Sequence, residues 1–127
     1  MSKLSIKWLG HSTFVITTPG GKRIVTDPWL EGNPACPPEH KRIEQADAIL
    51  LSHGHFDHTG DIVNVARATG ATTLAVFELS QWLERKGVQN VIGMDRFPEH
   101  LADWTTANWR TYYIEGAGEF RRKMLKR

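Results

Sequence analysis

The 127-residue sequence contains one cysteine, Cys36, and no long apolar run. A single cysteine excludes an intrachain disulfide and a zinc site built from several thiolates, so a bound metal would need histidine and carboxylate ligands. No segment approaches the roughly 20 apolar residues that a membrane-spanning helix requires. Lys3, Ser5 and Lys7 interrupt the apolar residues of the N-terminus. A signal peptide would instead contain a continuous apolar region. We therefore expect a cytoplasmic protein without a membrane span.

An excess of charge of one sign is also lacking, because 16 Lys and Arg nearly balance 14 Asp and Glu and the net charge is only +2. Residues 1–95 contain nine Lys and Arg against ten Asp and Glu, a balance of −1, whereas residues 96–127 contain seven against four, a balance of +3. A basic cluster at a chain end is more often solvated than bound to a partner. We expect a small-molecule substrate rather than nucleic acid.

The first third of the sequence predicts three short strands. Apolar residues alternate with polar ones at Leu4, Ile6 and Trp8, a second such run covers 13–18, and a third covers 23–26. Pro and Gly at 19–21 supply a turn between the second and the third run. The spacing predicts a small antiparallel meander.

The middle of the sequence predicts alternating strands and helices, and hence an α/β fold. A continuous apolar strand at 48–52 leads directly into a histidine cluster. After the cluster the pattern predicts a helix over 61–69 that ends at Gly70, a strand over 72–77, a helix over 78–86 that ends at Gly87, and a strand over 90–92.

The run His53-Gly54-His55-Phe56-Asp57-His58 places four metal-ligand side chains within six residues. Residues two apart on a helix point in different directions, so His53 and His55 can meet at one ion only from a loop. Such a loop can direct His53 and His55 at one metal ion, and Asp57 and His58 at a neighbouring one. Imidazole and carboxylate suit zinc, and also iron or manganese. A histidine-rich surface loop is the alternative, but the preceding apolar strand favours a metal site.

The same run resembles the H-x-H-x-D-H signature of the metallo-β-lactamase superfamily. The segment 26–29, Thr-Asp-Pro-Trp, is similar to that family's upstream aspartate, which lies beside the metals. The segments 8–13, 27–30, 77–79 and 91–94 resemble a branch of bacterial metal-dependent hydrolases related to ascorbate-6-phosphate lactonases and N-acylphosphatidylethanolamine phospholipases. This resemblance covers residues 4–95.

The resemblance implies the N-terminal half of an αβ/βα metallo-β-lactamase sandwich that hydrolyses an ester, lactone or phosphodiester. His53 and His55 would bind the first metal, and Asp57 and His58 the second, with Asp57 also helping to orient a water molecule. The cofactor would be one or two Zn²⁺ ions, with Mn²⁺ or Fe²⁺ as other candidates. Asp27 is interpreted as the partner of a metal ligand rather than as a cap of the turn at Pro28.

Two further histidines have open interpretations. His11 could contact a substrate at the mouth of the site, or it could satisfy a hydrogen bond in the first turn. His100 is interpreted as a surface histidine, since it lies outside the resembling segment.

We expect two parts in the chain: a partial metallo-β-lactamase-like domain over 1–95 and an unmatched basic, aromatic-containing tail over 96–127. Family members take further ligands from a C-terminal half, so the tail is interpreted as the product of a frameshift, truncation or recombination. The chain alone is then expected to be weakly active or inactive. The alternative is a non-catalytic metal-binding or interaction fragment.

This interpretation also predicts an uncovered sheet surface. The strands that contain Leu4, Ile6 and Trp8, and those that contain Ile49 and Leu51, would lack a second sheet to pack against. An apolar surface of that kind leads to homo-oligomers or aggregation.

Overall fold

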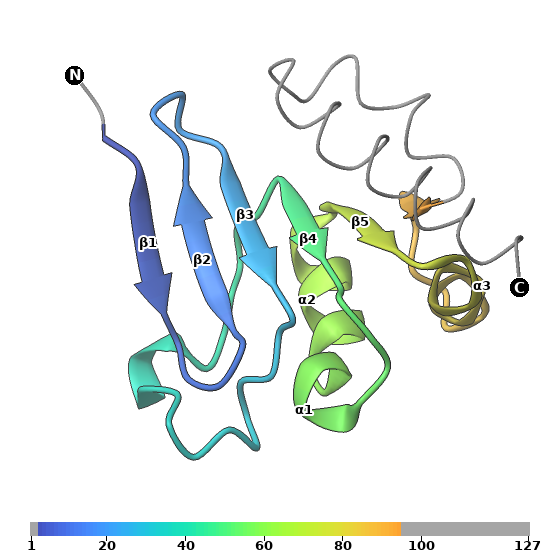
Figure 1. The fold of residues 1–127 in the computed structure, drawn as a ribbon, viewed down its shortest axis with the longest axis horizontal. Helices are drawn as coiled ribbons and strands as arrows, with labels where there is room; N and C mark the ends of the chain where they lie inside the picture. The colour runs from blue at the N-terminus through green and yellow to red at the C-terminus, as the bar shows by residue number, and fades with distance from the viewer. Residues whose placement is uncertain (1–2, 95–127) are drawn as a thin grey trace, which may run out of the picture. The chain divides into compact units, whose positions relative to one another are not determined.

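A computed structural model describes residues 3–94, which form one six-stranded mixed sheet and the helices that connect its strands (Figure 1). The strands follow the chain order across the sheet. They are β1 (Ser5–Trp8), β2 (Phe14–Thr17), β3 (Arg23–Thr26), β4 (Ala48–Leu50), β5 (Thr72–Ala75) and β6 (Val91–Gly93). The helices are η1 (Pro38–His40), α1 (Phe56–Thr59), α2 (Ile62–Thr69) and α3 (Phe77–Arg85). The predicted α/β class is confirmed.

Strands β1 to β3 form the predicted antiparallel meander. Trp8 pairs with Phe14, and Phe14 pairs with Thr26. The second turn closes with a hydrogen bond from the N–H of Thr18 to the carbonyl of Lys22, at 2.9 Å.

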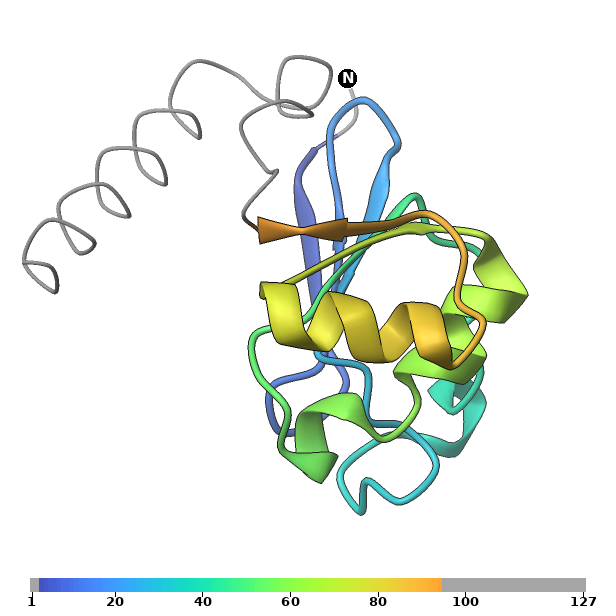
Figure 2. The same cartoon turned by 90° about the vertical axis from the view of Figure 1, so that its right-hand side faces the viewer.

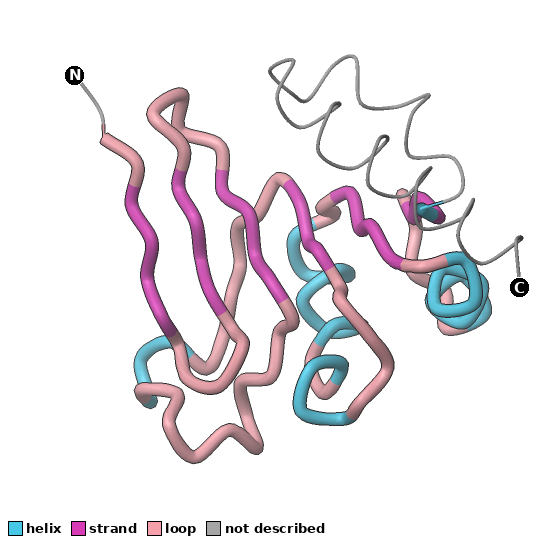
Figure 3. Tube along the Cα trace, in the orientation of Figure 1, coloured by secondary structure: helices cyan, strands magenta, loops and turns pink. Residues whose placement is uncertain are grey.

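Strands β3 to β6 are parallel to one another, so each connection returns the chain from the C-terminal end of one strand to the N-terminal end of the next. The connection from β3 to β4 is loop apart from η1, as Figure 3 shows, whereas the next two connections contain α1, α2 and α3. Helix α2 ends where the sequence predicts, because Gly70 adopts the left-handed conformation at φ 65° and donates its N–H to Ala66. Gly87, at φ 79°, has the same conformation after α3. Residues 96–127, including His100, lie outside the described residues.

Helices α2 and α3 cover one face of the sheet (Figure 2). The strand residues Val25 and Ile49 are fully buried on this face, and Ile62, Val65 and Leu83 of the helices pack into the same core. At about 25 cal/mol per Å² of buried apolar surface, this layer is the main source of stability for the described residues. None of the described helices is long and apolar enough to cross a bilayer.

The opposite face of the sheet bears apolar side chains that remain accessible. Leu4, Ile6 and Trp8 are 58%, 61% and 60% exposed. The pairing register places Ile6 and Trp8 on the face away from the helices, because Lys7 between them aligns with the core residue Val15. The expected exposure at this end of the sheet is therefore confirmed.

The same expectation was wrong for Ile49 and Leu51, which are 0% and 6% exposed. Side chains alternate between the two faces of a strand, so Ile49 and Leu51 share one face, and that face is the one that helices α2 and α3 cover.

Candidate metal centre

Three loops meet at one edge of the sheet and carry the candidate residues. Strands β1, β3 and β4 run in the same direction, so the segments that follow them lie at the same edge (Figure 1). These segments contain His11 after β1, Asp27 after β3 and the histidine cluster after β4. A hydrogen bond of 3.0 Å from the N–H of Asp27 to the carbonyl of Leu50 extends the pairing of β3 and β4 toward this edge.

The cluster itself is half loop and half helix. His53 lies in the loop after β4, as predicted, and His55 occupies the N-cap position of the single-turn helix α1. The N–H of His58 donates to the carbonyl of His55 at 3.0 Å, so Asp57 and His58 lie on a helical turn. The loop that the sequence predicts for His53 and His55 is confirmed. Asp57 and His58 lie on a helical turn that the sequence analysis did not predict, because four residues are too few to show a helical period.

His53 and His55 converge as two ligands of one ion would. The Nε2 atom of His53 lies 2.9 Å from Nδ1 of His55. Two imidazole lone pairs cannot face each other at that distance, so either a proton or a cation must lie between them. A divalent ion that displaces the proton between these two nitrogens would therefore be bound by both of them.

Asp57 and His58 form a second group of donors beside the first. The rings of His53 and His58 are 3.9 Å apart between centroids. Oδ1 of Asp57 lies 3.8 Å from Nε2 of His58, and Oδ2 lies 2.8 Å from Nε2 of His11. One donor atom from each of His11, Asp57 and His58 falls within 4.8 Å of the other two, which is close enough to surround a metal ion.

Asp27 is the most constrained charged residue of the site. Its side chain is buried and accepts three hydrogen bonds: from the N–H of Ser52 at 2.7 Å, from the Ser52 hydroxyl at 2.6 Å, and from Nδ1 of His58 at 2.8 Å. Its backbone has φ 40°, a left-handed conformation that costs energy in a residue other than glycine. The carboxylate thus contacts a candidate metal ligand directly.

His11 is brought to the site by a strained turn. It has φ 51°, follows Gly10 at φ 100°, and its carbonyl accepts a 2.8 Å hydrogen bond from the indole of Trp8. A side chain at Gly10 would approach Asn33 to within 2.9 Å, so the turn requires glycine there. The His11 imidazole contacts Asp57, which places it inside the cluster rather than within its own turn.

Two aromatic residues border the cluster. Trp29 packs edge-on against His11, with centroids 5.7 Å apart, and against Phe56, at 5.8 Å. Phe56 is 74% exposed, so the cluster lies beside an apolar surface that is open to solvent.

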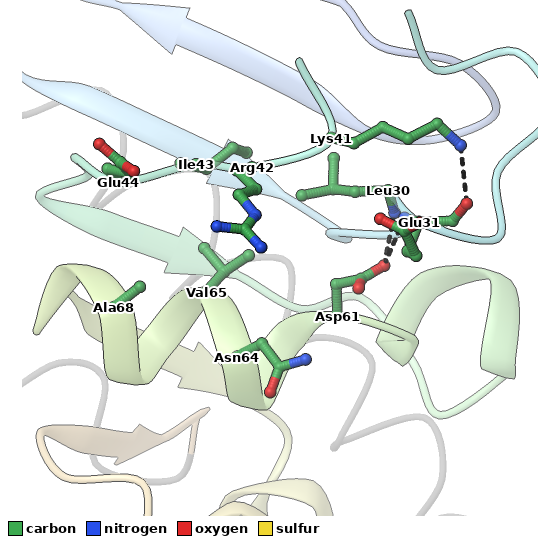
Figure 4. Close-up of a pocket in the computed structure, with 10 residues that line it drawn as sticks. All are labelled: Leu30, Glu31, Lys41, Arg42, Ile43, Glu44, Asp61, Asn64, Val65 and Ala68. Atoms are coloured by element: carbon green, nitrogen blue, oxygen red, sulfur yellow. Dashed lines mark hydrogen bonds between the residues drawn. The ribbon is translucent and has the colours of Figure 1, made fainter. Parts of the chain in front are cut away.

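A separate hollow of about 390 Å³ lies between α2 and the loop that precedes β4 (Figure 4). Lys41 and Asp61 from its wall already bind backbone groups: the ammonium donates to the carbonyl of Glu31, and the carboxylate accepts the N–H of Leu30 at 2.6 Å. The hollow includes no residue of the histidine cluster.

The sequence and the fold of this chain match known proteins. The family model described as a β-lactamase superfamily domain matches residues 5–123. The chain belongs to the β-lactamase superfamily. The Igni18 metallo hydrolase of Ignicoccus hospitalis superposes on 71% of this chain with a TM-score of 0.58 and 31% identity, and a CmlA β-hydroxylase shares the fold at a TM-score of 0.57 and 20% identity. The expected fold family is confirmed.

Curated members of this superfamily are also similar in sequence. A UPF0173 metal-dependent hydrolase of Koribacter versatilis is 45% identical over 101 residues, and one of Roseiflexus castenholzii is 54% identical over 95 residues. These segments cover 79% and 72% of this chain, but 43% and 37% of the two relatives. The chain thus spans about two fifths of the length of the curated relatives it matches. The family match passes residue 95, and the division of the chain at that residue stays a prediction.

The described donors fit a divalent ion. Histidine nitrogens and carboxylate oxygens are the ligands that zinc, iron and manganese share, and those of His53, His55, Asp57 and His58 all lie in one cluster. Reasoning from the sequence identified these four and Asp27, and left His11 open. It missed Ser52, although Ser52 directly precedes the first histidine.

Proposed function

We propose that this chain carries the metal-binding segment of a metal-dependent hydrolase. His53 and His55 would hold one ion, and Asp57 and His58 a second. The observation that carries the proposal is the convergence of these four side chains in one cluster, in which the buried carboxylate of Asp27 contacts His58. Zn²⁺ is the proposed metal, with Mn²⁺ and Fe²⁺ as alternatives that the same donors accept.

A bound divalent ion would supply a water molecule with a lowered pKa and polarise the bond to be hydrolysed. The residues of this chain have separate tasks around it. Asp57 is proposed to help orient the water, since one of its oxygens faces His58 and the other faces His11. His11, at 43% side-chain exposure, is proposed to contact the substrate. The apolar border at Phe56 and Trp29 suits an organic substituent of an ester, lactone or phosphodiester.

Metal binding is tested by titrating the metal-free chain with zinc against a competing dye. The double variant His53→Ala, His55→Ala should lose one binding event and retain the fold. His40→Ala is the matched control, because His40 ends the helix η1 and is no part of the cluster. Zinc affinity that is equal in the wild type and in the double variant would refute the proposed ligand set.

Hydrolysis is tested separately, with p-nitrophenyl acetate, a lactone and bis-p-nitrophenyl phosphate as substrates. Turnover that requires zinc and is lost in His58→Ala supports the hydrolase. Zinc binding without turnover of any substrate supports the second candidate, a non-catalytic metal-binding or interaction fragment.

A further inference from the structure

Ser52 lies between the buried carboxylate of Asp27 and the first histidine of the cluster. Its hydroxyl oxygen is 2.6 Å from Oδ2 of Asp27 and 2.8 Å from Nδ1 of His53. Both distances are short for hydrogen bonds of these types, so the hydroxyl takes part in both.

A hydroxyl has only one proton, and this fixes the direction of both bonds. The carboxylate of Asp27 can only accept, so the Ser52 proton must point toward it. The Ser52 oxygen is then an acceptor for His53, and Nδ1 of His53 must carry the ring proton. If the hydroxyl pointed at His53 instead, two acceptor oxygens would face each other at 2.6 Å.

The position of the ring proton decides which nitrogen of His53 can bind a metal. With the proton on Nδ1, the lone pair is on Nε2, the atom that lies 2.9 Å from Nδ1 of His55. Asp27 also accepts a hydrogen bond from Nδ1 of His58 at 2.8 Å, which leaves the lone pair of His58 on Nε2, facing Asp57.

We propose that Ser52 is a positioning residue that transmits the charge of Asp27 to His53, so that one carboxylate selects the ligand atom in both proposed metal positions. It acts on His58 directly and on His53 through the serine hydroxyl. This inference rests on the proposed metal site, but its first consequence, the tautomer of His53, exists without metal.

The tautomers can be measured directly in the full-length chain labelled with ¹⁵N. Long-range ¹H–¹⁵N spectra of the metal-free protein distinguish an imidazole protonated on Nδ1 from one protonated on Nε2. We expect the Nδ1–H form for His53 and for His58. We also expect His55 to donate Nδ1–H to His53 without metal, and to change to the Nε2–H form when zinc is added.

Variants of the hydroxyl separate this role from a general effect on folding. Ser52→Ala should shift His53 toward the Nε2–H form, leave His58 unchanged, and weaken zinc binding at His53 by roughly 10- to 100-fold. Ser52→Thr keeps the hydroxyl and should restore both properties. Thr59→Val is the matched control, since the Thr59 hydroxyl binds the backbone carbonyl of His55 rather than an imidazole.

The outcomes distinguish this inference from the proposed function. If wild-type His53 is protonated on Nε2, or if Ser52→Ala alters neither its tautomer nor its zinc-induced shifts, the role of Ser52 is refuted even where zinc binds. If the tautomers are as expected and zinc shifts none of the three histidines, the inference stands and the metal site is refuted. Ser52 is on the exposed side of the network, and the wild-type and Ser52→Thr spectra decide the question if Ser52→Ala does not fold.

Discussion

Replacement of Asp27 by asparagine removes one charge and almost no volume, and so tests the centre of the network. Asparagine tolerates positive φ as aspartate does, so the backbone at φ 40° gains no strain. The amide offers one acceptor oxygen where the carboxylate offers two. Ser52 N–H binds Oδ1, whereas the Ser52 hydroxyl and His58 bind Oδ2. Any orientation of the amide therefore leaves at least one donor facing an NH₂ group.

The expected loss of stability follows from the donor that no longer has an acceptor. In the cheapest orientation the amide oxygen keeps the hydroxyl and His58, and the N–H of Ser52 loses its acceptor. A buried donor without a partner costs about 1–3 kcal/mol, and this N–H is only partly buried, so the cost is at the lower end, about 1 kcal/mol. We expect the free energy of unfolding of Asp27→Asn to fall by that amount. Zinc affinity should fall by roughly 10- to 100-fold, because His58 loses a charged partner.

Urea unfolding with a chelator present measures the first effect without a contribution from metal. A second unfolding series with zinc measures the other, since a ligand at 100 times its Kd stabilises the folded state by about 2.7 kcal/mol. Asp47→Asn is the matched control: Asp47 also accepts a backbone N–H, from Arg23 at 2.8 Å, but lies directly before β4, away from the cluster. The reasoning would be refuted by an Asp27→Asn variant that matches the wild type in both series.

Three other predictions concern the surface, the cysteine and pH. Ile6→Glu, on the uncovered face of the sheet, should reduce self-association in size-exclusion chromatography at fixed concentration, and an unchanged elution volume would show that this face does not drive assembly. Burial raises the pKa of the Cys36 thiol, so a disulfide reagent should modify it slowly in the native chain and quickly in urea, and equal rates would contradict its burial. The backbone N–H of Arg23, and then Lys22, lower the pKa of Asp47 below 3.8. The ionised carboxylate of Asp47 should stabilise the folded chain by up to about 1 kcal/mol, a small value because the group is exposed. This stabilisation should be present above pH 3.8 and disappear as pH falls through the lowered pKa. A difference in the free energy of unfolding between wild type and Asp47→Asn that persists in acid would refute this.

Local patterns predicted most of the fold because they are local in the structure as well. The alternation of apolar and polar residues around Ile6 and Trp8 depends only on the geometry of one strand. The glycines at 70 and 87 end their helices by adopting a left-handed conformation, which is also a local property. The continuous apolar run 48–52 predicted strand β4 for the same reason, and the histidine cluster follows that strand directly.

Contacts between distant segments were not predictable in this way. Aspartate is a preferred N-cap residue, and Asp61 occupies the N-cap position of α2. Its side chain nevertheless makes no capping hydrogen bond. It accepts the N–H groups of Leu30 and Glu31 instead, about thirty residues earlier in the chain. The contact of His11 with Asp57 is of the same kind, and sequence alone could not choose between its two interpretations.

The sheet explains why Asp27 and Ser52 meet although 25 residues separate them. Thr26 pairs with Leu50, and the N–H of Asp27 then binds the carbonyl of Leu50, so the ladder continues to the residue that carries the carboxylate. On the other side, the N–H of Leu51 binds the carbonyl of Leu74 at 2.9 Å and holds the residue before Ser52. Backbone pairing therefore sets the distance between the carboxylate and the hydroxyl, which contact His58 and His53. A site whose supporting residues lie on strand ends is held more accurately than one supported by loops alone, and this is why a histidine loop that is partly open to solvent can present its donors before any metal is bound.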